Sequence, residues 1–255
     1  MPEMLTIGQF AIVYVLLIVI LAIMKKCNID QSKLVIIASV RMTVQLALAG
    51  VILTYIFDHP HPIFTVIYLL VITGFGVHMN LSKHKDLNKK FKIIISFSLA
   101  ITGMAVLAFY IIAVLGDNFF NPQLAIPLSG MIMGNAVSGV ALGMKTFKEN
   151  LRAKRNQIDT LINMGVTPQK TLLPLINQAI ETATLPTIIT MTSMGIIKLP
   201  GMMTGQMIAG AMPMTAILYQ ISVIIAIAAV TCLSVFCSLY FGYQTLWNER
   251  NQLEI

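Results

Sequence analysis

Charged residues are scarce in this chain, and so are other features of soluble and secreted proteins. Asp, Glu, Lys and Arg make up 11% of its 255 residues, whereas a soluble domain carries about 25%. The three cysteines have neither the spacing of a metal site nor that of a disulfide framework. Short segments of alternating polarity, which are typical of outer-membrane barrels, are missing. These absences argue against a soluble domain, a disulfide-stabilised scaffold and an outer-membrane barrel.

Catalytic and nucleotide-binding motifs are missing as well. The string from Gly143 to Thr146 lacks the glycine spacing and the Gly-Lys-Thr order of a phosphate-binding loop. Neither Gly-x-Ser-x-Gly nor His-Glu-x-x-His occurs. We therefore expect no enzyme activity, no cofactor and no metal site in this chain, so that any ATP and Mg²⁺ would bind to another polypeptide. The first residues lack the basic region and cleavage site of a signal peptide, so the first apolar stretch is expected to be retained.

Long apolar stretches are what the chain does contain. Hydrophobic residues make up 57% of it, and its mean hydropathy is +0.83. A bilayer core about 30 Å thick requires roughly 20 apolar residues in a helix. The pattern predicts an all-α membrane protein with a single domain over residues 1–255 and about seven transmembrane helices. The expected segments are 7–24, 34–57, 63–82, 92–115, 124–144, 180–197 and 215–243.

The distribution of basic residues predicts the orientation of these helices. Lysines and arginines follow the first, third and fifth segments, whereas residues 57–62 and 116–123 contain none. Because cytoplasmic loops are enriched in Lys and Arg, we expect the N-terminus outside and the C-terminus inside, in the inner (cytoplasmic) membrane. This topology also explains the net charge of +7 without a nucleic-acid partner. The basic residues are Lys25, Lys26, Lys33, Lys83, Lys85, Lys89, Lys90, Lys92, Lys145, Lys148, Arg152, Lys154, Arg155 and Lys170.

The segment from 145 to 179 is predicted to form a helical hairpin in the cytoplasm. Residues 146–163 have a helix-forming composition, and Gly165 can end that helix in the left-handed conformation. Thr167 can cap a second helix whose first residue is Pro168. A short rigid helix of this kind suits docking onto a partner protein; the alternative is a solvated hairpin that binds nothing.

Residues 198–214 are too few to span a bilayer, and they are rich in Gly, Met and Pro. They are expected to form either a broken or re-entrant element, which membranes tolerate only when it is buried in protein or faces water, or an ordinary external loop. Glycine adopts backbone angles that other residues avoid. The candidate hinge residues are Pro200, Gly201, Gly205 and Gly210.

Small residues recur along the fifth segment. Gly130, Gly134 and Ser138 repeat every four residues, and Gly139 and Gly143 form a second pair. Such spacing allows helices to approach closely in lipid. The stripe also contains Asn135. A buried amide needs hydrogen-bond partners, so this side chain either joins two helices or lines a pathway.

Few ionisable residues occur within the apolar segments. Arg41 lies one turn before Gln45 in the second segment, and Glu181 begins the sixth. Charge at membrane depth is costly and marks functional candidates. One hypothesis is that Arg41 and Glu181 face each other across the helix bundle. The candidates for a substrate pathway or gate are Arg41, Gln45, Asn135 and Glu181.

Several strings occur in an order that resembles one protein family. They are Gly130 to Ala136, Leu161 to Gln169, Leu199 to Gly205, Ala209-Gly210 and Tyr219 to Ile221. Together they resemble the Fet-type iron-export ABC permeases, a family that also contains plant aluminium-tolerance permeases. The resemblance implies a homodimer of permeases paired with two separate ATP-binding subunits, and links the chain to metal export and metal resistance. The residues expected to contact the ATPase are Asp159, Gly165, Thr167, Pro168 and Gln169.

The predicted function is therefore the membrane-spanning permease subunit of an ABC transporter that exports iron, another metal or a metal complex. The alternative is a secondary transporter or channel that uses no ATP. Secondary transporters often contain inverted repeats, and no convincing repeat is visible. A purely structural or sensory membrane subunit is a third possibility, in which mutations of the hairpin or of the intramembrane charges would have no effect.

Overall fold

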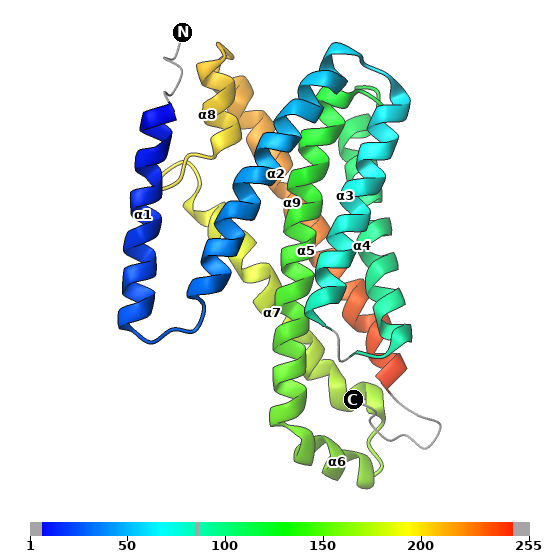
Figure 1. Cartoon of the computed structure of the whole chain (residues 1–255). Coiled ribbons are helices and arrows are strands. Elements are labelled where there is room, and N and C mark those ends of the chain that lie inside the picture. The colour runs from blue at the N-terminus through cyan, green and yellow to red at the C-terminus, as the bar shows by residue number, and fades with distance from the viewer. Residues whose placement is uncertain (1–6, 85–86, 247–255) are drawn as a thin grey trace. The chain divides into compact units, whose positions relative to one another are not determined.

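A computed structural model describes the backbone of residues 7–84 and 87–246, and the side chains of all these residues except 7 and 9–11. Lys85 lies outside the described residues. The regular structure of this part is entirely helical, which confirms the predicted all-α class (Figure 1). In chain order the α-helices are α1 (Ile7–Lys26), α2 (Ser32–Asp58), α3 (Pro62–Lys83), α4 (Lys89–Phe109), α5 (Pro122–Ala153), α6 (Arg155–Asn163), α7 (Pro168–Ser193), α8 (Gly201–Ile208) and α9 (Pro213–Gly242).

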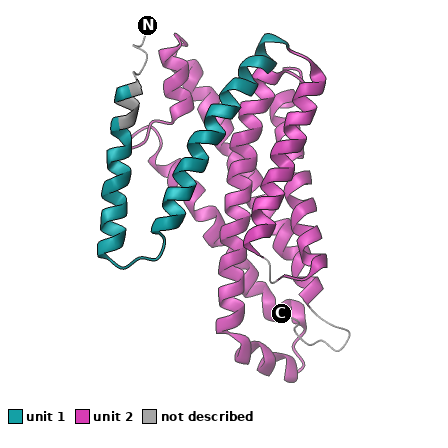
Figure 2. Ribbon diagram, viewed as in Figure 1, with its two compact units in different colours: residues 1–59 teal, residues 60–255 magenta. Residues whose placement is uncertain are grey.

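The chain divides into two compact units (Figure 2). Unit 1, residues 1–59, contains α1 and α2, and unit 2, residues 60–255, contains the remaining helices. In the described part of unit 1, Ile56 is the one buried hydrophobic residue. Helices with so little buried surface require lipid or protein around them, because their apolar side chains are not covered within the unit.

Five described helices are long and apolar enough to cross a membrane. They are α2, α3, α4 together with the π-helical turn Tyr110–Val114, α5, and α9 extended to Leu246. The chain is therefore a multi-pass membrane protein. The first and sixth expected segments, 7–24 and 180–197, are not among these five. The total of seven spans and their orientation thus remain predictions.

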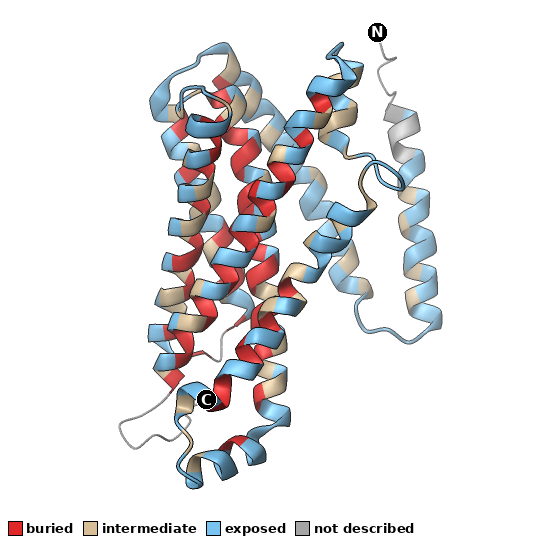
Figure 3. Cartoon of the chain, turned by 180° about the vertical axis from the view of Figure 1, so that it is seen from behind, coloured by how far each residue is buried: buried red, intermediate tan, exposed pale blue. Residues whose placement is uncertain are grey.

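Helix α5 lies at the centre of unit 2, where it packs against α3, α4, α7 and α9. Buried residues lie along the helices of unit 2, where they are coloured red in Figure 3. Phe91, Ile95 and Leu99 of α4 are fully buried, and so are Ile132 and Val140 of α5. Burying apolar side chains in this way leaves few gaps between neighbouring helices.

The glycines of α5 differ in their surroundings. A Cβ atom on Gly139 would lie 2.5 Å from Thr231 Cγ2, and one on Gly143 would lie 2.9 Å from Val235 Cγ1, so α9 approaches α5 closely at both. The predicted tight packing is confirmed for this pair. Within the described chain the prediction of tight packing is wrong for Gly130 and Gly134, where a Cβ would have no neighbour within 4 Å.

Helix α5 also continues beyond its expected end at residue 144. It runs to Ala153, and a break at Lys154 separates it from α6, so residues 146–163 are not one helix as expected. Buried Phe147 and Leu151 extend the apolar face past the end of the apolar segment. This packing stabilises the polar extension, which is about 13 Å long at 1.5 Å per residue.

Helix α7 starts earlier and ends earlier than expected. It runs from Pro168 through Pro174 and Pro186 to Ser193, whereas the sequence suggested a span of 180–197. Proline inside a helix costs about 3 kcal/mol. The buried side chains of α7 help to offset this cost. They are Thr171, Leu172, Leu175, Ile176, Ala179 and Ala183. Residues 194–198 form a turn in which Gly195 has φ +83°.

Candidate functional site

The connection between α6 and α7 forms a sharply defined turn. Gly165 has φ +87°. The Val166 amide donates to the Leu161 carbonyl at 3.0 Å, and the Gly165 amide donates to the Ile162 carbonyl at 2.8 Å. This pair of bonds is the Schellman motif, which favours glycine because its central residue is left-handed. The predicted helix end at Gly165 is therefore confirmed.

Helix α7 begins as the sequence indicates. Thr167 occupies the N-cap position with extended backbone angles, and Pro168 is the first helical residue. The Thr167 side chain, however, makes no capping hydrogen bond. Its cap position therefore depends on backbone geometry and on the following proline, which is pre-organised for the first turn of a helix.

We call residues 161–169 the α6–α7 tip, and most of its side chains are exposed. Met164 is 76% exposed and Leu161 is 40% exposed, whereas Ile158 of α6 is buried. Asp159 and Gln169 are exposed as well. The buried side chain of Ile158 belongs to the hydrophobic core of unit 2, whereas the tip presents apolar and polar groups to its surroundings. Of the predicted ATPase-contacting residues, Gly165, Thr167 and Gln169 are exposed in the tip, Pro168 is half-buried there, and Asp159 is exposed on α6 just before it.

The Gly/Met/Pro-rich segment contains the short helix α8, which packs against α9. Pro200 is the N-cap of α8, and Gly201 and Gly205 lie within it. Of the three predicted hinge glycines, Gly210 has a positive φ, +96°, and it ends α8 in a second Schellman motif. Gly201 and Gly205 do not use the backbone freedom that suggested a hinge. The sequence did not single out Gly195, which does use it.

One face of α5 stays uncovered within unit 2. We call Gly130, Gly134, Asn135 and Ser138 the open face of α5, since all four residues are exposed. The Asn135 amide nitrogen donates to the Met131 carbonyl at 2.8 Å, and the Ser138 hydroxyl donates to the Gly134 carbonyl at 2.9 Å. Both bonds lie within α5, so Asn135 does not join two helices of unit 2 by this bond.

Glu181 also lies on a face that its own unit leaves exposed. At about 100° per residue, its position on α7 is roughly opposite the buried Ala179 and Ala183. The buried side of α7 packs against α5 and α9. Glu181 therefore points away from the core of unit 2.

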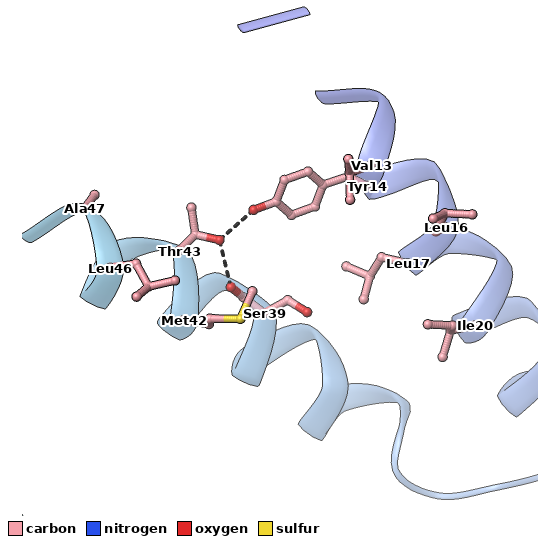
Figure 4. A pocket seen from close by; sticks show the side chains of 10 residues that line it. All are labelled: Val13, Tyr14, Leu16, Leu17, Ile20, Ser39, Met42, Thr43, Leu46 and Ala47. Carbon is pink, nitrogen blue, oxygen red and sulfur yellow. Dashed lines mark hydrogen bonds between the residues drawn. The ribbon is translucent and has the colours of Figure 1, made fainter. Parts of the chain in front are cut away.

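Unit 1 contains a cavity of about 600 Å³ between α1 and α2. Figure 4 shows the Tyr14 hydroxyl directed at Thr43, and their oxygens form a hydrogen bond, while the other lining side chains are mostly apolar. Arg41 and Gln45 are exposed and do not line this cavity. Their positions are roughly opposite Thr43 on α2, so both lie on the face that points away from α1. Arg41 belongs to unit 1 and Glu181 to unit 2, and their pairing stays a prediction.

Buried polar residues in unit 2 were not anticipated. The Asn80 amide nitrogen donates to the Val137 carbonyl at 3.0 Å, and Tyr110 OH lies 2.8 Å from Ser222 Oγ. Thr102 Oγ1 and Ser234 Oγ are 2.6 Å apart. Polar contacts between helices hold membrane bundles together. A single polar residue within an apolar run of sequence indicates such a contact. Which residue it contacts depends on how each helix is rotated about its axis, which the sequence does not show.

Residues 7–84 and 87–246 contain no group of three or more His, Cys, Asp or Glu side chains that could hold a metal ion. Among the predicted pathway residues, those with a side-chain oxygen are Gln45, Asn135 and Glu181, and all three are exposed.

The sequence strings that resemble a known family lie in the same part of the chain as the open face of α5, the α6–α7 tip and the short helix α8. The model of the family described as "Uncharacterised protein family (UPF0014)" matches residues 7–247. The chain belongs to the UPF0014 family.

Several relatives match nearly the whole chain. The Escherichia coli protein named "Probable iron export permease protein FetB" is 31% identical over 97% of this chain and 94% of its own. The Bacillus subtilis "UPF0014 membrane protein YjkA" is 26% identical over 96% of this chain and 98% of its own. The Arabidopsis thaliana "Protein ALUMINUM SENSITIVE 3" is 25% identical over 96% of this chain and 88% of its own. These matches confirm the family resemblance. No solved structure matches this UPF0014 protein.

Proposed function

We propose that this UPF0014 protein is the permease subunit of an ATP-driven exporter in the cytoplasmic membrane. Two copies would form the translocation pathway, and a separate subunit would bind and hydrolyse ATP with Mg²⁺. The exported species is iron, another metal or a metal complex. The observation that supports the use of ATP is the exposed α6–α7 tip. The metal substrate is suggested by the name of the Escherichia coli relative.

The shape of the tip supports docking onto an ATPase. α5 extends beyond its apolar segment, α6 crosses its end, and the Schellman turn at Gly165 holds the tip in one conformation. A rigid element loses little conformational freedom when it binds, which favours mechanical coupling. The 76% exposed Met164 offers an adaptable apolar side chain of the kind that fills a partner's groove.

The uncovered polar faces support a pathway that forms on assembly. Asn135 lies on the open face of α5, Glu181 on the exposed face of α7, and Arg41 on the face of α2 away from α1. Polar and charged side chains at membrane depth normally face protein or a water-filled cavity rather than lipid. We infer that these faces line a common aqueous pathway in the assembled transporter.

The ligand chemistry agrees with a hard cation or its complex as the substrate. Hard metal ions prefer oxygen ligands, and Glu181, Asn135 and Ser138 provide carboxylate, amide and hydroxyl oxygens. Glu181 is the one carboxylate among these candidate ligands, and it cannot supply the several ligands that a bare ion requires. A metal complex, or an ion held between two copies, fits this set better.

The decisive test compares two neighbouring tip variants, Met164→Asp and Asn163→Asp. Both add a negative charge to an exposed residue, but the first also removes the apolar side chain. We expect Met164→Asp to lower recovery of a co-purifying ATPase and export of iron from loaded cells by about tenfold, and Asn163→Asp to change both by less than about twofold. Ten-fold corresponds to about 1.4 kcal/mol of contact free energy.

Two results would contradict the proposal. One is a permease that purifies without any ATP-binding subunit yet moves the metal down an ion gradient, which would favour the ATP-independent alternative. The other is recovery of the ATPase by Met164→Asp at the wild-type level, which would remove the tip as the contact.

A further inference from the structure

A second cavity lies beside the basic end of α5, and none of its lining residues belongs to the α6–α7 tip. It has a volume of about 510 Å³ and lies between the end of α3 and one stripe of α5. The α5 residues at its two ends are Ser138 and Arg152, and at 1.5 Å per residue they are about 21 Å apart along the helix. By the positive-inside rule this end of unit 2 faces the cytoplasm.

Basic side chains outnumber carboxylates in the described part of the lining. Among the described residues, the cationic side chains are Lys83, Lys145, Lys148 and Arg152, and the one carboxylate is Glu149. Glu149 lies 3.9 Å from Lys145, and both side chains are largely exposed. An exposed ion pair of this kind contributes little to stability. Lysine and arginine side chains that converge on a hollow raise the local concentration of anions.

Polarity changes along the cavity. Ala141 and Leu142 belong to the apolar segment of α5, whereas the basic lining residues of α5 lie beyond Met144, where that segment ends. Topology requires only that cytoplasmic loops contain basic residues. It does not require that these residues share one helix stripe and line a hollow with an apolar wall.

We propose that this cavity binds a phosphate group, with the Lys83, Lys148 and Arg152 side chains as its main partners. Lysine and arginine are the usual phosphate ligands in proteins, and arginine can bind two phosphate oxygens at once. The apolar wall next to the basic end fits the headgroup and upper chain of an anionic phospholipid, and basic pockets on the cytoplasmic side bind such headgroups. A soluble phosphate would use the basic end alone. This site does not depend on the proposed transport function.

The test uses the full-length chain in neutral detergent, without an ATPase. The pocket variant combines Lys83→Gln, Lys148→Gln and Arg152→Gln. Its matched control combines Lys89→Gln, Lys90→Gln and Lys154→Gln, which removes the same charge from the same side of the protein at exposed positions outside the cavity. Native mass spectrometry measures bound phosphatidylglycerol and phosphatidylcholine, and thermal unfolding measures binding of inorganic phosphate against chloride at equal ionic strength.

We expect the wild type and the control to bind phosphatidylglycerol at least about tenfold more tightly than phosphatidylcholine, and the pocket variant to lose that preference. If inorganic phosphate instead raises the melting temperature of the wild type and the control but not of the pocket variant, the source of the phosphate is soluble. Equal losses in both variants, or a wild type that neither prefers phosphatidylglycerol nor is stabilised by inorganic phosphate, would overturn the proposal. If the triple variant does not fold, Arg152→Gln alone against Lys154→Gln tests the same contact with the same criteria.

Discussion

Two faces of α5 are built from the same kinds of residue but have different surroundings. At Gly139 and Gly143 the neighbouring helices come so close that a Cβ would lie within 3 Å of α9. At Gly130 and Gly134 a Cβ would have no neighbour within 4 Å. Both pairs have the four-residue spacing that allows close helix packing. The difference indicates that one face builds the fold of unit 2, while the other is left for contacts outside it.

The largest expected effect on stability is at Gly139, on the face of α5 that packs against α9. Gly139→Leu adds a branched side chain where its Cβ would lie 2.5 Å from Thr231 Cγ2. Overpacking of this kind lowers the free energy of unfolding by about 1–3 kcal/mol or more. We expect a lower apparent melting temperature and poor recovery of folded protein in detergent. Gly130→Leu is the control, and equal destabilisation by both would abolish the distinction between the faces.

A smaller effect, on metal export, tests whether the exposed faces that contain Arg41 and Glu181 contact each other in the assembled transporter. We expect Arg41→Glu and Glu181→Arg each to lower metal export by about fivefold or more, and the double reversal to restore it to within about twofold, since pairs in contact couple by about 0.5–3 kcal/mol. Export is measured in loaded cells at equal expression. Lys33→Glu combined with Glu181→Arg is the control, because Lys33 lies in the first turn of α2. Without recovery by the first double variant, the proposed pairing fails.

The smallest expected effect is a change in stability whose sign differs between the two faces of α5. Gly134→Ala adds a methyl group to a helical residue with open space around it, and alanine favours helices over glycine by about 0.5–1 kcal/mol. We expect the isolated chain to become slightly more stable. Gly143→Ala places the Cβ 2.9 Å from Val235 Cγ1 and 3.3 Å from Ala183 Cβ, and is expected to lower stability. Thermal unfolding of the two purified variants measures the difference, and the same sign for both would contradict the comparison.

Apolar segments without proline were predicted well. The expected segments 34–57 and 63–82 differ from α2 and α3 by two residues or fewer at each end. The turn at Gly165 and the helix start at Pro168 were predicted as well, since both follow from local backbone chemistry. Helix α7 was not, because its passage through Pro174 and Pro186 depends on packing against α5 and α9.

The sequence by itself determined that the chain is helical, crosses a membrane several times and presents a capped turn between α6 and α7. Each of these follows from hydrophobic length and local backbone preference. Only the tertiary structure decided which glycines of α5 touch a neighbour, that Asn135 and Glu181 face away from the core of unit 2, and that basic side chains of α3 and α5 line one cavity. Spacing places residues on one helix face, but the rotation of each helix is set by the packing of all its neighbours.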